Sequence, residues 1–255
     1  MLIAVFLNFH VWETHYKVYT DKNIGTNNLR VVQISDSHIG TTFNGKDLKK
    51  YVDRINKTNP DIVVITGDFI DDATSKKDMI DACKSLSYLK STYGTYFVYG
   101  NHDQGYNANF EIKTSDLEEE FAKNNVTVLA DEVIEINDYI YIIGRKDKRM
   151  IRKTIDSLTN DLNKDRYMID LNHQPNDYKN ESDANIDLVL SGHTHGGQLF
   201  PLGYIGELFG ANDAFYGLEK INNTTFIVNS GISDWALYFK TGTKSEYNVI
   251  DIKSK

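Results

Sequence analysis

The stretch LRVVQISDSHIGTTFNGKDLKKYVDRINKTNPDIVVITGDFID, residues 29–71, contains two apolar runs with an amphipathic segment between them. Residues 29–35 and 61–67 are rich in β-branched side chains, which is typical of strands buried on both faces. The intervening segment has four apolar residues at the spacing of one helix face: Leu48, Tyr51, Val52 and Ile55. This order predicts two parallel strands joined by a right-handed crossover.

The same alternation continues along the chain and then gives way to a pattern dominated by strands. Helices are expected over 75–94, 115–125 and 148–160, and a strand is expected over 95–100. The later predicted strands are 126–137, 139–147, 167–173, 186–193, 224–231 and 246–252. We expect an α/β (α+β) fold with helices outside packed sheets. Because no linker, repeat or charge block interrupts the pattern, we also expect a single domain over residues 1–255.

The composition narrows the classes of function. The chain has 255 residues, a formal net charge of −8 and one cysteine, Cys83. One cysteine excludes an internal disulfide and a thiolate zinc cluster, and Cys83 is predicted to be a buried helix residue. The negative charge argues against a long nucleic acid as partner. The one basic cluster, 144–153, is interpreted as a loop leading into a solvated helix face, or alternatively as a surface that steers a phosphorylated substrate.

The apolar start of the chain, MLIAVFLNFHVW at residues 1–12, has two interpretations. As a helix it would be about 18 Å long, short of the roughly 30 Å hydrocarbon core of a membrane. It has neither a basic leader nor a small-residue cleavage site. It is therefore either the stub of an N-terminal membrane or export segment, or the first strand of the domain.

Polar side chains follow five of the predicted strands at the point where each strand ends. They are Asp36 and His38; Asp68 and Asp71; Asn101, His102 and Asp103; His173; and His193 and His195. The carboxyl ends of strands in open α/β sheets are where ligands gather. Each pair alone has an ordinary interpretation as a turn or a satisfied polar residue. Five such strand ends, which hold five of the seven histidines, together favour a metal site.

The ligand types indicate which ions such a site would bind. Imidazole and oxygen ligands without thiolate suit divalent Mn, Fe, Zn or Ni. The candidates are too many for one tetrahedral ion, and a carboxylate is able to bridge two. Two ions about 3.5–4 Å apart are the arrangement used for displacement at phosphoesters.

At these residues the chain resembles the calcineurin-like metallophosphoesterase superfamily. The resemblance covers roughly 29–235 and follows five blocks in order: Asp36-x-His38, Gly67-Asp68-x-x-Asp71, Gly100-Asn101-His102-Asp103, His173, and Gly192-His193-x-His195. It implies a four-layer αββα sandwich of two mixed β-sheets flanked by helices. The stretches 171–178, 191–203 and 229–233 resemble a bacterial, often membrane-associated subgroup of phosphodiesterase-like proteins, which makes peripheral membrane association an expectation.

The resemblance also implies roles for individual residues. Asp36, His38 and His195 would hold the first metal, Asp68 would bridge both metals, and Asn101, His173 and His193 would hold the second. His102 would face the phosphoryl group, where it would stabilise developing charge or protonate the leaving oxygen, and a hydrogen bond to Asp71 would orient it. A hydroxide bound by both metals would be the nucleophile. Gly192, Gly196 and Gly197 are expected to let the backbone pass close to substrate or metal.

The chain departs from the protein phosphatases of the superfamily in ways that bear on the substrate. Asp71 is followed by Asp72-Ala73 instead of Arg-Gly, and Asp103 stands where those enzymes have Glu. Lys240 either replaces an arginine of the bacterial subgroup or lies on the surface. The segment 201–220 is either a packed Ω-like loop or a lip that contacts the leaving group through aromatic residues, namely Phe200, Tyr204, Phe209 and Phe215.

The sequence therefore predicts a two-metal hydrolase, with Mn favoured for activity. Its substrate would be a small-molecule, nucleotide or lipid phosphoester, cleaved at a phosphodiester or pyrophosphate bond. A phosphomonoesterase with the same site is the alternative, and a non-catalytic metal-binding interaction module is a further one.

Overall fold

The two β-branched runs form adjacent parallel strands, as the sequence predicts. Strand β2 (Asn28–Ile34) pairs with β3 (Ile62–Thr66), and Val31 lies opposite Ile62. Helix α2 (Gly45–Asn56) connects them, and the Asn44 side chain caps its first turn. The four apolar residues of the helix face are buried against the sheet.

The computed structural model describes residues 2–104, 112–235 and 237–255, and in it β2 and β3 lie inside the first of two mixed six-stranded sheets. The order of the first sheet is β1-β12-β2-β3-β4-β5. Its other strands are β1 (Trp12–Thr20), β4 (Thr95–Val98), β5 (Val126–Leu129) and β12 (Glu246–Ser254). All its neighbours are parallel except β12 and β2. The first and last strands of the chain are thus neighbours at one edge.

The second sheet has the order β10-β11-β9-β8-β7-β6. Its strands are β6 (Glu132–Asn137), β7 (Ile140–Gly144), β8 (Tyr167–Leu171), β9 (Leu188–Ser191), β10 (Gly217–Ile221) and β11 (Thr224–Val228). Pairs β6–β7 and β10–β11 are antiparallel, and the three inner pairs are parallel. The strand predicted over 126–137 is divided into β5 of the first sheet and β6 of the second, and the β6–β7 hairpin turns at residues 138–139.

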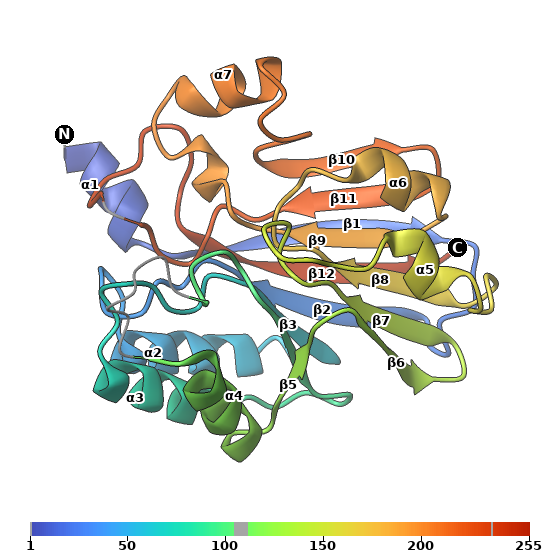
Figure 1. Cartoon of the computed structure of the whole chain (residues 1–255), viewed down its shortest axis with the longest axis horizontal. Coiled ribbons are helices and arrows are strands. Elements are labelled where there is room, and N and C mark those ends of the chain that lie inside the picture. Colours follow the sequence, from blue (N-terminus) through green and yellow to red (C-terminus); the bar gives the residue numbers. More distant parts are fainter. Residues whose placement is uncertain (1, 105–111, 236) are drawn as a thin grey trace.

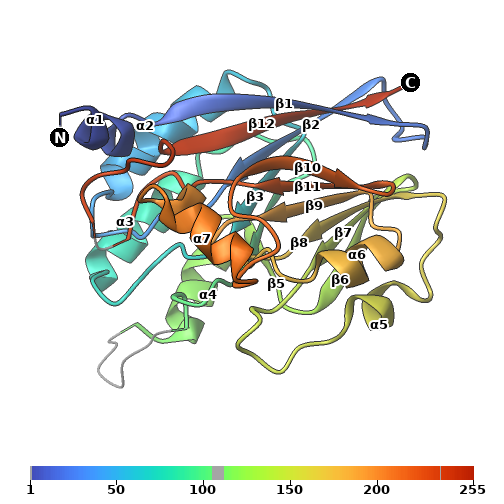
Figure 2. The same cartoon turned by 90° about the horizontal axis from the view of Figure 1, so that it is seen from above.

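The inner faces of the two sheets pack against each other, and helices cover the outer faces (Figures 1 and 2). Helices α2, α3 (Lys76–Leu86) and α4 (Thr114–Lys123) cover the first sheet. Helices α5 (Ile155–Thr159) and α6 (Tyr178–Asp183) cover the second. This is the expected four-layer αββα sandwich, and Cys83 is buried within α3, where burial raises the pKa of its thiol.

The helix expected over 148–160 is shorter than predicted. Only Ile155–Thr159 is helical, and the basic residues before it form an extended loop. The loop wraps around Asp131, whose carboxylate accepts hydrogen bonds from the backbone N–H groups of Lys146 and Lys153. These tertiary bonds satisfy the loop backbone without a helix.

The apolar start of the chain forms a helix, so the alternative of a first strand over residues 1–12 is wrong. Residues Leu2–Phe9 form α1, and β1 begins three residues later. Within the described residues, no helix has both the length and the apolar character needed to cross a membrane. Helix α7 (Leu202–Leu208) lies toward the same end of the molecule as α1 (Figures 1 and 2).

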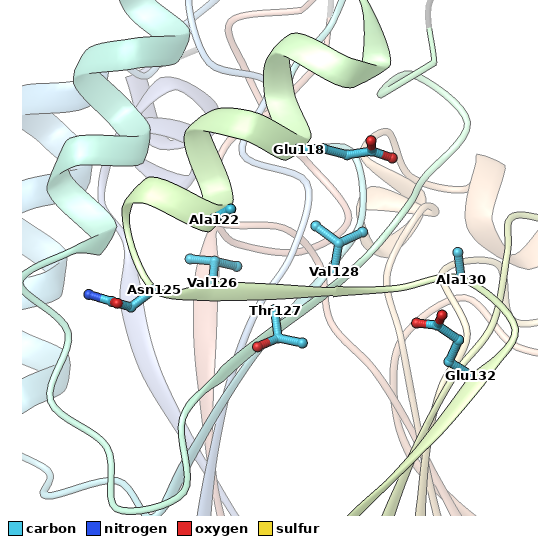
Figure 3. Close-up of a pocket in the computed structure, with 8 residues that line it drawn as sticks. All are labelled: Glu118, Ala122, Asn125, Val126, Thr127, Val128, Ala130 and Glu132. Atoms are coloured by element: carbon cyan, nitrogen blue, oxygen red, sulfur yellow. The ribbon is translucent and has the colours of Figure 1, made fainter.

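A hollow of about 650 Å³ lies between α4 and the edge strand β5 (Figure 3). Val126 and Val128 point from β5 toward α4, whereas Asn125 lies at one end of the hollow and Glu132 at the other. Glu118 accepts a hydrogen bond from the Tyr99 hydroxyl. Because no imidazole or cationic side chain is among its lining residues, this hollow is not the site that the sequence predicts.

Candidate metal centre

The predicted ligands converge at the carboxyl ends of strands from both sheets. They follow β2, β3 and β4 in the first sheet, and β8 and β9 in the second. All seven are at least partly buried: Asp36, His38, Asp68, Asn101, His173, His193 and His195. Six of them form two groups whose ligand atoms lie within 4.8 Å of one another. We name Asp36, His38 and His195 the first triad, and Asp68, His173 and His193 the second triad.

In the first triad, the two imidazoles face each other through Nε2. His38 Nε2 lies 3.2 Å from His195 Nε2, and His195 Nε2 lies 3.7 Å from Asp36 Oδ1. Each Nδ1 has a carboxylate partner at 3.2 Å, which is Asp71 for His38 and Asp234 for His195. A partner on Nδ1 fixes the tautomer and leaves Nε2 for a metal.

The second triad repeats this arrangement with a backbone partner. His173 Nδ1 lies 2.7 Å from the Thr66 carbonyl oxygen, so it donates there. His173 Nε2 lies 3.2 Å from Asp68 Oδ2, yet it makes no hydrogen bond within the described structure. His193 Nδ1 is likewise buried without a hydrogen bond there. Buried nitrogen atoms of this kind call for a partner, and a cation among them would supply one.

Asp68, a member of the second triad, also lies close to the first triad. Its Oδ2 atom is 3.2 Å from His173 Nε2 and 3.9 Å from His38 Nε2. Burial alone would raise the pKa of the Asp68 carboxyl, but the nearby His173 and His38 lower it well below its usual range. Burial and the neighbouring His173 lower the pKa of His193 to about 4, so His193 is neutral at pH 7. An ionised carboxylate and a neutral imidazole are the forms that bind metals.

The backbone at the site is held in an uncommon conformation. Five predicted ligands have a positive φ angle: Asp36 (51°), His38 (39°), Asp68 (51°), His193 (72°) and His195 (50°). Non-glycine residues in this region are uncommon and are concentrated where function requires them. The adjacent glycines admit the close approach of loops. A Cβ on Gly192 would collide with Ser35 Oγ and the Asp36 carboxylate, and one on Gly100 would collide with Asp68.

A family model for calcineurin-like phosphoesterases matches residues 29–197, more than half of the chain. The chain belongs to the calcineurin-like phosphoesterase family. The uncharacterized metallophosphoesterase Cj0846 of Campylobacter jejuni is 31% identical over 233 residues, covering 89% of this chain and 60% of that protein. The transmembrane protein with metallophosphoesterase domain of Danio rerio is 34% identical over 241 residues, covering 89% and 54%. The chain thus spans about half to three fifths of the length of these relatives.

Metallophosphoesterase YkuE of Bacillus subtilis is 29% identical and is covered more completely, at 98% of this chain and 89% of YkuE. Two solved structures share the fold. TT1561 of Thermus thermophilus superposes with a TM-score of 0.50 at 13% identity, covering 80% of this chain and 89% of that one. NAD nucleotidase of Haemophilus influenzae superposes with a TM-score of 0.50 at 16% identity, covering 80% and 50%. Such low identities show the fold alone.

A second hollow lies beside the two triads, and it also includes the predicted ligand Asn101 and the expected proton donor His102. Its volume is about 560 Å³, and its lining residues are Asp68, Asp72, Asn101, His102, Arg149, His193, His195 and Trp235. The backbone N–H of His102 donates to Asp68 Oδ1 at 2.8 Å. The His102 ring packs against Trp235 with 5.5 Å between ring centroids, and burial lowers the pKa of His102.

The expected contact between Asp71 and His102 is wrong. Asp71 Oδ2 lies 3.2 Å from His38 Nδ1 and accepts a hydrogen bond from Thr41 Oγ1 at 2.9 Å. The backbone N–H of Ala73 donates to Asp71 Oδ1. Asp71 therefore orients a candidate metal ligand, because its loop turns toward the end of β2.

Two carboxylates at the site were not identified as site residues from the sequence. Asp103 accepts hydrogen bonds from four backbone N–H groups: those of Asp68, Phe69, Ile70 and Gly100, at 2.7–3.1 Å. Asp103 thereby fixes the loop that carries Asp68. Its position in the block Gly-Asn-His-Asp was the available signal. Asp234, whose carboxylate contacts His195, lies in a loop without periodicity, so no sequence pattern pointed to it.

Other expectations near the site need correction. Lys240 is fully buried, so it neither lies on the surface nor lines the hollow. A Cβ on Gly196 would meet Thr243, and one on Gly197 would meet Gly203, so these glycines admit the close approach of neighbouring loops. The segment 201–220 contains α7 and most of β10, and none of its aromatic residues is among those lining the hollow.

Proposed function

We propose that the protein hydrolyses a phosphodiester or pyrophosphate bond with the help of two divalent cations. The observation that carries the proposal is the pair of ligand triads, in which Asp68 of the second triad also lies 3.9 Å from His38 of the first, beside a hollow that also contains His102. Membership of a hydrolytic metallophosphoesterase family supports the reaction class. The choice of a diester or pyrophosphate is the finer part of the proposal.

The proposed roles follow from the geometry. Two bound cations would neutralise charge on the phosphoryl group and activate water for attack. Asp36, His38 and His195 would hold one cation, and Asn101, His173 and His193 the other. His102 is close enough to Asp68 to face the same phosphoryl group, and a proton from its ring would stabilise the leaving oxygen. We propose Mn²⁺ as the activating ion because the donors are nitrogen and oxygen without thiolate.

The lining of the hollow supports a substrate with two ester groups. Its volume of about 560 Å³ is larger than a phosphoryl group needs. Trp235, whose side chain is half exposed, offers an apolar face beside His102 for the second ester group.

The test is a metal-reconstituted assay with two chromogenic substrates. The protein with Mn²⁺ should release p-nitrophenol faster from bis-p-nitrophenyl phosphate than from p-nitrophenyl phosphate. His193→Ala should remove this activity, whereas His15→Ala, which alters an exposed histidine away from the hollow, should keep it. Faster turnover of the monoester would make the protein a phosphomonoesterase. No metal-dependent turnover of either substrate would favour a non-catalytic interaction module.

A lipid phosphoester is the substrate class that the surface around the hollow supports best. Helix α1 has no charged residue, and Leu2, Ile3 and Phe6 are mostly exposed. Leu208, the last residue of α7, and Phe209, which follows it, are more than 80% exposed. Exposed apolar surface of this extent is typical of interaction sites. We propose that this surface rests on the face of a lipid bilayer, with the hollow beside it.

Sedimentation with phosphatidylcholine vesicles tests this part of the proposal. The double variant Leu208→Ser with Phe209→Ser should leave more protein in the supernatant than the unaltered chain. Leu218→Ser, which changes an exposed leucine on β10, is the matched control and should bind as the unaltered chain does. Failure of the unaltered chain to sediment would refute membrane docking and leave the proposed hydrolytic activity intact.

A further inference from the structure

A fully buried ion pair lies directly behind the first triad. Lys240 Nζ lies 3.0 Å from Asp234 Oδ1 and donates to the Ser230 carbonyl oxygen at 2.6 Å. Asp234 Oδ1 also lies 3.2 Å from His195 Nδ1. Neither Lys240 nor Asp234 has any exposed surface. One carboxylate oxygen is thus shared by a buried ammonium group and a candidate metal ligand.

Stability alone does not account for such a pair. Lysine is almost never fully buried, and apolar residues of similar volume usually stabilise a core as well as an ion pair does. Placement beside His195 supplies a reason that core packing does not. A carboxylate on Nδ1 fixes which nitrogen carries the proton and turns Nε2 toward the other ligands.

The contacts of Asp234 make Lys240 necessary for its orientation. In the described part of the chain, Asp234 Oδ2 has no hydrogen-bond partner, so Oδ1 makes both polar contacts of the carboxylate. Without Lys240, only the imidazole of His195 would hold the carboxylate. Asp71, which has the same task at His38, is held in addition by Thr41 and Ala73. The two histidines of the first triad are therefore positioned by different means.

We propose that Asp234 and Lys240 are a positioning pair: Lys240 holds Asp234 in place, and Asp234 directs Nε2 of His195 toward the first metal position. The proposal rests on the metal centre of the proposed function and is independent of the substrate. It predicts that the pair affects binding of one of the two cations, because His173 in the second triad relies on the Thr66 carbonyl instead.

The decisive variant replaces both partners with apolar residues of similar size, Asp234→Leu with Lys240→Met. Removing both charges together leaves neither one buried alone, so the double variant should keep the free energy of unfolding close to that of the unaltered chain. Titration calorimetry with Mn²⁺ should show two binding events for the unaltered chain. In the double variant, one event should be about 10–100-fold weaker and the other unchanged.

A second variant and a matched control separate positioning from stability. Lys240→Met alone changes no atom that touches His195, and it should also weaken one Mn²⁺ event. Arg30→Met with Asp251→Leu removes an ion pair at the opposite end of β2 and β12, and it should leave both events unchanged. Electron paramagnetic resonance of the bound Mn²⁺ should show that the coupled signal of two neighbouring ions is lost only in the Lys240 and Asp234 variants.

The possible outcomes distinguish this proposal from the proposed function. If the stable double variant binds both Mn²⁺ ions as tightly as the unaltered chain does, the pair is structural and the proposal is overturned. If Lys240→Met alone leaves both affinities unchanged, the part assigned to Lys240 is wrong. If the unaltered chain binds no Mn²⁺, the metal centre itself, and with it the proposed function, fails.

Discussion

Asp103→Asn tests whether the loop that carries Asp68 is held by a single carboxylate. The two oxygens of Asp103 each accept two backbone N–H groups: Phe69 and Ile70 on Oδ1, and Asp68 and Gly100 on Oδ2. An asparagine side chain has one oxygen and one NH₂ group. In either orientation it leaves two buried N–H groups facing another donor.

The size of the effect follows from those two lost bonds. An unsatisfied buried donor costs about 1–3 kcal/mol, so the free energy of unfolding should fall by about 2–6 kcal/mol. The measurement is urea unfolding followed by circular dichroism, at pH 8 with EDTA present so that metal binding does not contribute. Because the Asp68 backbone is released as well, Mn²⁺ affinity should also decrease.

The control is Asp53→Asn, which changes a carboxylate that is 58% exposed on α2. Its effect on the free energy of unfolding should lie within about 0.5 kcal/mol. If Asp103→Asn is equally mild, the four hydrogen bonds do not hold the loop, and the explanation given for Asp103 is refuted.

Three other measurements probe the same centre. Gly192→Ala should weaken Mn²⁺ binding by about tenfold or more in calorimetry, because the added Cβ would displace Asp36. The control Gly206→Ala should not weaken binding, because the nearest atom to its added Cβ is 3.9 Å away. Burial lowers the pKa of His173, but Asp68 outweighs this and raises it to about 10, so Mn²⁺ must displace a proton at pH 7.5. The Mn²⁺ affinity should therefore rise with pH toward 10. Calorimetry in buffers of different ionisation enthalpy should detect the released proton, and the absence of proton release would contradict the assignment of His173 as a ligand. Trp235→Ala should raise KM for bis-p-nitrophenyl phosphate with little change in kcat, and an unchanged KM would remove Trp235 from the proposed substrate contact.

The ligand positions were accessible to sequence reasoning because they are tied to strand ends. An apolar run that ends at Asp, Asn or His can be recognised in the sequence, and the sandwich brings the carboxyl ends of these strands together. Partners of the ligands were less accessible. Asp71 follows β3, close to both His38 and His102 in the fold, and only the path of the loop decides which imidazole it meets.

The remaining errors have a common physical origin in tertiary contacts. Residues 148–154 have a helical pattern, but in the folded chain they form a loop in which the Lys153 N–H donates to Asp131 instead of to a helix carbonyl. No sequence pattern marks Lys240 as a buried residue. Its partner Asp234 is a loop residue, and the two charges are paired and buried only in the folded chain. Strand β10 is mostly exposed, and its apolar and polar residues alternate only weakly. Its sequence pattern therefore does not differ from that of a loop.

Helix α1 is connected to the metal centre by a short series of contacts. The Ala4 carbonyl oxygen accepts a hydrogen bond from the backbone N–H of Lys240, whose side chain reaches Asp234 and, through it, His195. Two equilibria then share one set of bonds, the docking of α1 and the loading of a cation. Thermodynamic reciprocity requires that, where the two equilibria are coupled, each changes the equilibrium constant of the other by the same factor. A change at the first nine residues that weakens the docking of α1 should therefore be readable as a change in cation affinity, and a bound cation should favour the docked helix.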